Sequence, residues 1–164
     1  MLRPALTALL LAASLPVAAE SLNYNIVEFS ESANMEVPRD TMTAHFSINA
    51  EGKDRQAVNQ VFMKKFNQFN KISQNSKFKA ELMERNASPR YQYTNGKRTQ
   101  TGWEEHAYFK VESKDFEALN RLIADSINIA VLESSSFSVS KEKREETVDQ
   151  LSKAVILRFK DRAQ

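Results

Sequence analysis

The residues that could build a catalytic or metal site are few and scattered. The chain holds two histidines, His45 and His106, and one acidic pair next to the second of them, Glu104 and Glu105. Imidazole and carboxylate groups bind Zn²⁺ at hydrolytic sites, so these side chains define a candidate metal-dependent hydrolase. The histidines lack a His-x-x-x-His or His-x-His spacing, and neighbours on a strand point to opposite faces. We therefore do not expect Glu104 and Glu105 to act as an acid–base pair.

Other signatures of enzyme chemistry are missing from the sequence. It contains no Gly-x-Ser-x-Gly elbow, no Ser-x-x-Lys and no phosphate-binding loop. Three glycines make a glycine-rich cradle improbable, and the absence of cysteine excludes thiolate metal sites and disulfides. The sequence favours a protein that is not an enzyme and that uses no cofactor.

Aromatic and basic residues form the second candidate site. It consists of Tyr91, Tyr93, Arg90, Arg98 and Trp103. Such residues stack on nucleic-acid bases, but a net charge of +2 is too small to indicate a nucleic-acid partner. Tyr, Trp and Arg are also common in protein interfaces, which is the interpretation we favour. Two alternatives stay open: the rings pack on their own sheet, or they bind a carbohydrate or another small ligand.

A hairpin is predicted to carry these residues. Asn95-Gly96 is the strongest short signal for a two-residue turn, because both residues tolerate positive φ. A turn centred there places Leu82 opposite Phe109, which is a sensible core pair, and Arg85 opposite His106.

The same register predicts the surroundings of the two tyrosines. Tyr91 and Tyr93 share one face of their strand and lie opposite Gln100 and Arg98, which are polar. Pro89 cannot donate a ladder hydrogen bond, so we expect an edge strand or a bulge near it. A bulge would shift the register by one residue.

The remaining elements follow from hydrophobic periodicity. Period-two or β-rich patterns predict strands, and apolar residues three and four apart predict helices. The strands are expected over 24–31, 41–49, 78–85, 102–112 and 131–139, and the helices begin at Asp54, at Ser113 or Asp115, and near Lys143. The order β-β-α-β-β-α-β-α indicates an α+β fold with a mostly antiparallel sheet and helices packed on one face. The last helix should dock on the sheet through Val148, Leu151, Val155 and Phe159.

The N-terminus is typical of an export signal. Arg3 precedes an uncharged run over 5–13, and Val17 and Ala19 fit the small positions of a cleavage site. The apolar run is too short to span a membrane, and no second long apolar stretch follows Glu20. We expect a signal peptide over 1–19, cleavage after Ala19, and a mature domain over 20–164 in the periplasm or outside the cell, with no transmembrane segment.

Several short motifs follow one another along the chain: Val37-Pro38-Arg39-Asp40 before a strand, Ile48-Asn49-Ala50-Glu51-Gly52-Lys53, Ser88-Pro89-Arg90-Tyr91-Gln92-Tyr93, Thr101-Gly102-Trp103 and Ser136-Phe137-Ser138-Val139-Ser140. In this order they resemble the SIMPL-domain family of bacterial periplasmic and secreted proteins, which includes the periplasmic immunogenic proteins. Two features differ from the family pattern. Residues 30–34 replace a glycine-rich stretch, and the chain stops inside the last helix, so we expect a truncated domain that lacks its C-terminal strands.

The resemblance implies an α+β domain without an established enzymatic activity. It also implies that some members assemble into rings and that the family is linked to envelope or oxidative stress. The expectation is therefore a non-enzymatic exported protein that forms homo-oligomers and contacts an unknown envelope protein. The alternatives are a small-ligand or carbohydrate binder and, less favoured, a metal-dependent hydrolase.

Overall fold

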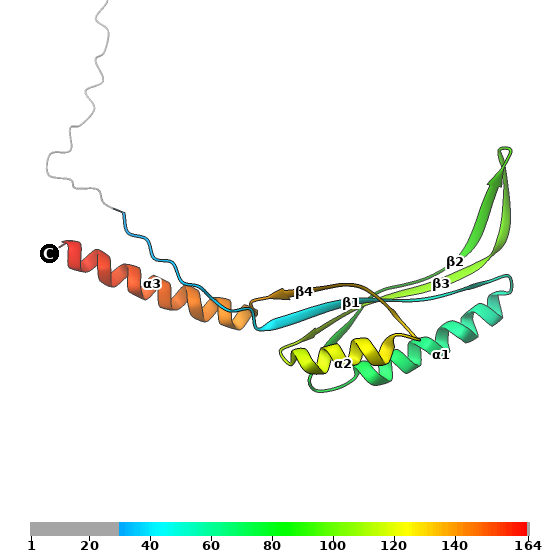
Figure 1. The fold of residues 1–164 in the computed structure, drawn as a ribbon. Helices are drawn as coiled ribbons and strands as arrows, with labels where there is room; N and C mark the ends of the chain where they lie inside the picture. The colour runs from blue at the N-terminus through cyan, green and yellow to red at the C-terminus, as the bar shows by residue number, and fades with distance from the viewer. Residues whose placement is uncertain (1–29, 164) are drawn as a thin grey trace, which may run out of the picture. The chain divides into compact units, whose positions relative to one another are not determined.

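A computed structural model gives the fold and describes residues 30–163. Its elements are β1 (Thr41–Gly52), α1 (Arg55–Ser73), β2 (Lys79–Thr94), β3 (Lys97–Ser113), α2 (Phe116–Ser126), β4 (Val131–Ser138) and α3 (Lys141–Ala163) (Figure 1). From residue 41 onward, this is the predicted order. The expected signal peptide and most of the strand expected over 24–31 lie outside the described residues, and Ser30 and Glu31 have no regular structure.

The four strands form one antiparallel sheet in the order β2-β3-β1-β4. Helices α1 and α2 cover one face of it, which confirms the predicted α+β architecture (Figure 1). The rings of Phe46, Phe69 and Phe109 join β1, α1 and β3, with centroids 4.9 Å apart in each neighbouring pair. The core therefore lies between this face and the two helices.

Both helices of the core begin at the predicted caps. The carboxylate of Asp54 accepts a hydrogen bond from the N–H of Ala57 at 2.7 Å, and Asp115 accepts one from Ala118 at 2.9 Å. Each cap binds one of the backbone donors that the first turn of a helix leaves without a partner. The caps fix the point at which the chain leaves β1 and β3 and turns back over the sheet.

The turn of the β2–β3 hairpin forms as predicted. Asn95 has φ of 52° and Gly96 has φ of 76°. The expected pairing of Leu82 with Phe109 is confirmed. Strand pairing continues through 86–101, so both strands are longer than the sequence indicated.

The predicted pairing of Arg85 with His106 is wrong by one residue. Arg85 lies opposite Ala107 instead. The register shifts because Met83 is an extra residue on β2, and it shifts back because Thr101 is an extra residue on β3. The expected bulge near Pro89 is therefore present, and β2 is an edge strand, as the proline required. The two bulges cancel, so the core pairs and the turn keep their predicted register while the middle of the hairpin does not.

Helix α3 does not dock on the sheet, contrary to the expectation from its apolar stripe. No residue of α3 is buried in the described chain. The helix-bearing face of the sheet is already covered by α1 and α2. Residues 32–40 run beside α3 instead (Figure 1), and Arg158 donates a hydrogen bond to the carbonyl of Ser32 at 3.3 Å.

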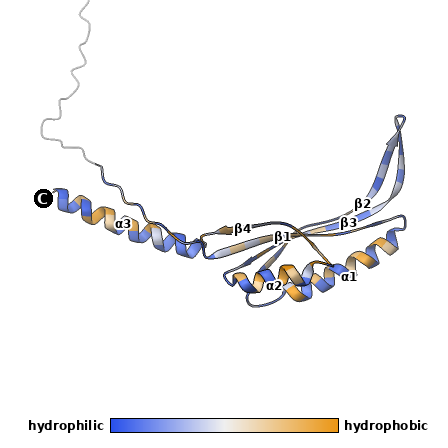
Figure 2. Ribbon diagram, in the orientation of Figure 1, coloured by the Kyte–Doolittle hydropathy of each residue, from blue (hydrophilic) through white to orange (hydrophobic). Residues whose placement is uncertain are grey.

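Figure 2 shows that α3 carries apolar residues among many hydrophilic ones. Within residues 30–163, no helix has both the length and the apolar character needed to cross a membrane.

Candidate functional site

The hairpin of β2 and β3 extends past the rest of the sheet. Strand β1 pairs with β3 only as far as Gly52 opposite Trp103. Residues 90–101, which we call the ribbon, therefore have only each other as ladder partners within the described chain (Figure 1). A two-stranded ribbon without a third strand has no core of its own, so side chains on it are available for contacts elsewhere.

Tyr91, Tyr93 and Arg98 lie together on the ribbon. Tyr91 pairs with Gln100 and Tyr93 with Arg98, as predicted. The guanidinium of Arg98 lies 3.5 Å from the centre of the Tyr91 ring, a cation–π contact. Tyr91 is 40% exposed and Tyr93 69% exposed. Both rings are therefore accessible to solvent on the ribbon.

Arg90 and Trp103 do not join this group. Arg90 forms an ion pair with Glu51 at 2.8 Å, which ties the base of the ribbon to the end of β1. Trp103 is half-buried against the hydrophobic core, and the guanidinium of Arg55 lies 4.9 Å from the centre of its ring. The structure thus brings together three of the five candidate residues and assigns the other two to the base of the ribbon.

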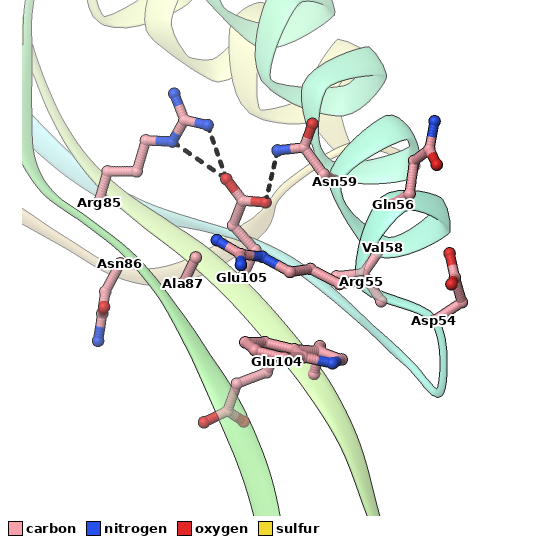
Figure 3. A pocket seen from close by; sticks show the side chains of 11 residues that line it. Asp54, Arg55, Gln56, Val58, Asn59, Arg85, Asn86, Ala87, Glu104 and Glu105 are labelled. Carbon is pink, nitrogen blue, oxygen red and sulfur yellow. Dashed lines mark hydrogen bonds and ion pairs between the residues drawn. The ribbon is translucent and has the colours of Figure 1, made fainter.

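A cavity of about 890 Å³ opens at this base, between the start of α1 and strands β2 and β3 (Figure 3). Its lining residues are Asp54, Arg55, Gln56, Val58, Asn59, Arg85, Asn86, Ala87, Trp103, Glu104 and Glu105. They combine one indole ring with amide, carboxylate and guanidinium groups. Such a lining could hold a small polar ligand against an aromatic face.

A buried ion pair forms one wall of the cavity. Glu105 is 4% exposed, and its carboxylate accepts hydrogen bonds from Arg85 at 2.6 and 3.2 Å and from Asn59 at 2.9 Å (Figure 3). The guanidinium of Arg85 also lies 5.0 Å from the Phe62 ring and 5.4 Å from the Phe66 ring. Asn59 on α1 and Arg85 on β2 therefore both bind the carboxylate of Glu105 on β3. These hydrogen bonds hold α1 against the sheet.

Sequence reasoning missed the pair of Arg85 and Glu105. In the simple hairpin register, Arg85 lay opposite His106 and pointed away from Glu105. Only the extra residue at Met83 turns Arg85 to the helix-bearing face, diagonal to Glu105. A bulge at a methionine between a leucine and a glutamate leaves no distinctive pattern in a single sequence.

The residues of the candidate metal site stay apart. His45 contacts Ser134 through Nδ1 at 3.3 Å, whereas His106 lies 3.5 Å from Glu84. The two histidines lie opposite Lys110 and Asn49 in the β1–β3 pairing, four positions apart along the sheet. Within residues 30–163, no group of three His, Cys, Asp or Glu side chains converges to hold a metal ion.

Glu104 and Glu105 point to opposite faces of β3, as predicted. Glu104 is exposed and accepts a hydrogen bond from the hydroxyl of Ser88 at 3.1 Å, while Glu105 is buried on the helix-bearing face. The two carboxylates therefore cannot share a substrate or a proton.

The antiparallel sheet, the two helices on one face and the projecting ribbon define an α+β protein. The family model described as SIMPL, a protein of unknown function (DUF541), matches residues 27–164. The chain belongs to the SIMPL family. This confirms the resemblance carried by the short motifs, and it assigns no activity.

Comparisons with other proteins add little to this assignment. No curated protein sequence matches the chain. Among solved structures, a de novo designed protein, Foldit4, is similar over 62% of this chain and 99% of its own, with 9% identity and a TM-score of 0.30. The crystal structure of AtUAH in complex with glyoxylate is similar over 60% of this chain but only 29% of its own, with 8% identity and a TM-score of 0.29. Neither likeness is close enough to support a functional argument.

Proposed function

We propose that this SIMPL protein is a non-enzymatic, exported protein that acts through protein–protein contacts, with the ribbon as its interface. Its partners are further copies of the same chain and a protein of the bacterial envelope. The family resemblance also supports a role in envelope or oxidative stress.

One observation carries the proposal: Tyr91, Tyr93 and Arg98 form an exposed group on a ribbon that no other described strand covers. Aromatic rings offer a large contact area with few rotatable bonds, so they lose little entropy on binding. The Arg98 guanidinium already stacks on Tyr91, which holds the ring in one orientation before a partner arrives. Pre-organisation of this kind lowers the cost of association.

Removal of both rings tests the interface. The variant Tyr91→Ser with Tyr93→Ser should lower the oligomer mass in light scattering while the circular dichroism of the folded chain is unchanged. Tyr108→Ser is a matched control, because Tyr108 is 41% exposed but lies on β3 within the sheet. An unchanged mass in the double variant would contradict the proposal. Loss of the fold would show that the rings belong to the core.

A second candidate function is binding of a carbohydrate or another small polar ligand. The cavity at the base of the ribbon favours it, because Trp103 contributes an aromatic surface beside several hydrogen-bonding side chains. Trp103 is the only tryptophan, so tryptophan fluorescence, excited where tyrosine does not absorb, reports on this site alone. A saturable change in fluorescence with a saccharide, lost in an Arg55→Ala variant, would support this function over the protein interface.

The non-enzymatic part of the proposal is tested by metal analysis. Purified protein should contain no stoichiometric zinc. Zinc that is present at one equivalent and lost on replacement of His45 or His106 would favour the metal-dependent hydrolase instead. A pull-down from an envelope fraction, with and without the two ribbon tyrosines, would identify the partner.

A further inference from the structure

Two guanidinium groups on the helix-bearing side of the hairpin have no carboxylate partner within residues 30–163. Arg98 on the ribbon lies 3.5 Å from the centre of the Tyr91 ring and forms no ion pair there. Arg55 extends from the first turn of α1 into the cavity, 4.9 Å from the centre of the Trp103 ring, and likewise forms none (Figure 3). Both side chains are exposed. Because each guanidinium is stacked on a ring, the N–H donors at its edge are available to a ligand.

The two rings occupy neighbouring positions on one face of the hairpin. Pro89, Tyr91 and Tyr93 alternate along β2, so they share its helix-bearing face. Trp103 pairs with Pro89, which is two residues from Tyr91. Two residues of a strand span about 7 Å, so the two rings and their guanidinium groups follow one another along the hairpin. An extended chain has the same period, since its side chains at i and i+2 point to the same side.

The acidic side chains of this region are mostly engaged by other groups. Four of them lie in the cavity wall or beside it: Glu51, Asp54, Glu104 and Glu105. Glu51 and Glu105 form ion pairs with Arg90 and Arg85. The Glu104 carboxylate lies on the opposite face, where it accepts the hydrogen bond from Ser88. Asp54 accepts the capping hydrogen bond of α1 and is the one of the four that contacts neither a basic group nor a hydroxyl in the described chain.

The basic side chains of the same region outnumber the acidic ones. The ribbon contains three of the 23 basic residues of the chain and none of its 21 acidic residues. Across the ribbon and the cavity, four basic side chains contact no carboxylate in the described chain: Lys53, Arg55, Lys97 and Arg98. Only Asp54 opposes them, so the charge that remains is positive. A second ribbon has the same charges and does not complement this surface, whereas an acidic partner does.

We propose that the ribbon and the cavity at its base form one site, which binds an extended acidic segment of a partner protein with carboxylates two residues apart. The inference rests on the proposed function, since it names the chemistry of the protein that the ribbon contacts. One carboxylate binds the edge of the Arg98 guanidinium and the other binds the edge of Arg55, a geometry that suits paired N–H···O hydrogen bonds. The amides of Gln56 and Asn86, which line the cavity, provide hydrogen bonds for the main chain of the segment.

A saccharide is the less suitable occupant of this surface. Sugars pack on the open face of an aromatic ring, but Arg98 already lies on one face of Tyr91 and Arg55 on one face of Trp103. Trp103 is also half-buried against the hydrophobic core, so it has little further ring surface to offer. A carboxylate approaches the edge of the guanidinium and needs neither ring face. The stacked arrangement therefore favours an acidic peptide.

Short labelled peptides test the spacing of the carboxylates. Fluorescein-labelled Thr-Thr-Glu-Thr-Glu-Thr-Thr should bind the purified protein with a saturable rise in fluorescence anisotropy. Its isomer Thr-Thr-Glu-Glu-Thr-Thr-Thr directs the two carboxylates to opposite sides when extended, so it forms one ion pair and should bind about fivefold more weakly. Thr-Thr-Gln-Thr-Gln-Thr-Thr should give no saturable signal. Equal affinity for the two glutamate peptides, or no saturable binding of the first, would overturn the proposal.

Replacement of each arginine tests the site itself. Arg98→Gln and Arg55→Gln should each weaken binding of the first peptide about fivefold, the size expected for one solvent-accessible ion pair. Both side chains are exposed, so the circular dichroism of the folded chain should be unchanged. Lys97→Gln is the matched control, because Lys97 is next to Arg98 but points to the other face of the ribbon. It should change the dissociation constant less than about twofold. An equal loss in Lys97→Gln and Arg98→Gln would indicate unspecific attraction between charges and overturn the proposal.

The peptide site and the proposed function can fail separately. If the oligomer mass depends on Tyr91 and Tyr93 but the first glutamate peptide does not bind, the peptide site is rejected while the ribbon remains an interface. If the peptide binds with the expected spacing and the oligomer mass is unchanged in the tyrosine variant, the peptide site is supported and self-association through the ribbon is rejected. Oligogalacturonate that binds where the peptide does not, with weaker binding to Arg55→Gln, would identify an acidic saccharide as the ligand and overturn the inference.

Discussion

Asp40 and Ser140, one hundred residues apart, are joined by two hydrogen bonds to one carboxylate. The backbone N–H of Ser140 donates to Asp40 at 2.6 Å, and its hydroxyl donates at 2.7 Å. The Ser140 oxygen in turn accepts from the N–H of Lys143 at 3.3 Å in the first turn of α3. The aspartate of the Val-Pro-Arg-Asp motif thus holds the start of β1 to the cap of α3, which gives this motif a structural role.

Stability should fall in acid through Asp40. The hydrogen bonds from the hydroxyl and the N–H of Ser140 lower the pKa of Asp40 below its ordinary value of 3.8. A group whose pKa is lowered by folding stabilises the protein above the unfolded pKa, and this contribution disappears as the pH falls through the folded pKa. Asp115 contributes with the same sign, because Lys77 lowers its pKa.

The measurement is the thermal midpoint between pH 7 and pH 2. The thermal midpoint of the parent should fall below about pH 4. Asp40→Asn should have a lower thermal midpoint than the parent at pH 7 and a smaller decrease on acidification. Asp125→Asn, at an exposed position near the end of α2, is the control and should follow the parent. Equal slopes for Asp40→Asn and the parent would show that this carboxylate does not contribute to the acid sensitivity.

Gly102 should tolerate no side chain. A Cβ at this position would lie 2.3 Å from the carbonyl oxygen of Gly52 on the paired strand and 3.1 Å from its carbonyl carbon, and these backbone atoms cannot move aside as the end of a flexible side chain can. Gly102→Ala should therefore cost about 1–3 kcal/mol of the free energy of unfolding, measured by urea denaturation. Gly52→Ala is a useful comparison, because its Cβ would meet only the Val58 side chain, at 3.1 Å. A smaller loss in Gly102→Ala than in Gly52→Ala would contradict the close approach of the strands.

Local signals were sufficient for much of the fold. The caps at Asp54 and Asp115 and the turn at Asn95-Gly96 depend on residues within a few positions of one another. Such features follow from donor and acceptor chemistry and from allowed φ angles. They were predicted correctly because no distant residue changes their geometry.

Features that depend on distant partners were not predicted. The bulges at Met83 and Thr101 place Arg85 on the helix-bearing face, and nothing near these residues signals the extra positions. The stripe of α3 likewise suggested docking on the sheet. Hydrophobic periodicity shows that one face of a helix is apolar, but it does not show which surface packs against that face. In this fold α1 and α2 already cover the helix-bearing face of the sheet, and no residue of α3 is buried in the described chain.

The export signal expected from the sequence makes a prediction for the N-terminus of the isolated protein. Protein recovered from a bacterial envelope or culture medium should begin at Glu20, because Val17 and Ala19 fit the positions before a cleavage site. Intact mass spectrometry measures this directly. Ala19→Pro should block processing and leave a chain that begins at Met1. An unprocessed Met1 on the parent protein from the same fraction would contradict the prediction.

Substitutions of the two members of the buried ion pair, Arg85 and Glu105, should lower the free energy of unfolding by different amounts. Arg85→Met should cost about 3 kcal/mol of the free energy of unfolding, because it leaves the Glu105 carboxylate buried with only Asn59 to bind it. Glu105→Gln should cost less, since the amide still accepts a hydrogen bond and the Arg85 side chain, 39% exposed, keeps part of its hydration. Urea denaturation of both variants and of the double variant measures the difference. Because the double variant leaves no buried charge, it should be more stable than Arg85→Met alone. If Glu105→Gln proved the more damaging single change, the carboxylate would have a role other than pairing with Arg85, and its position at the wall of the cavity would then favour a ligand contact.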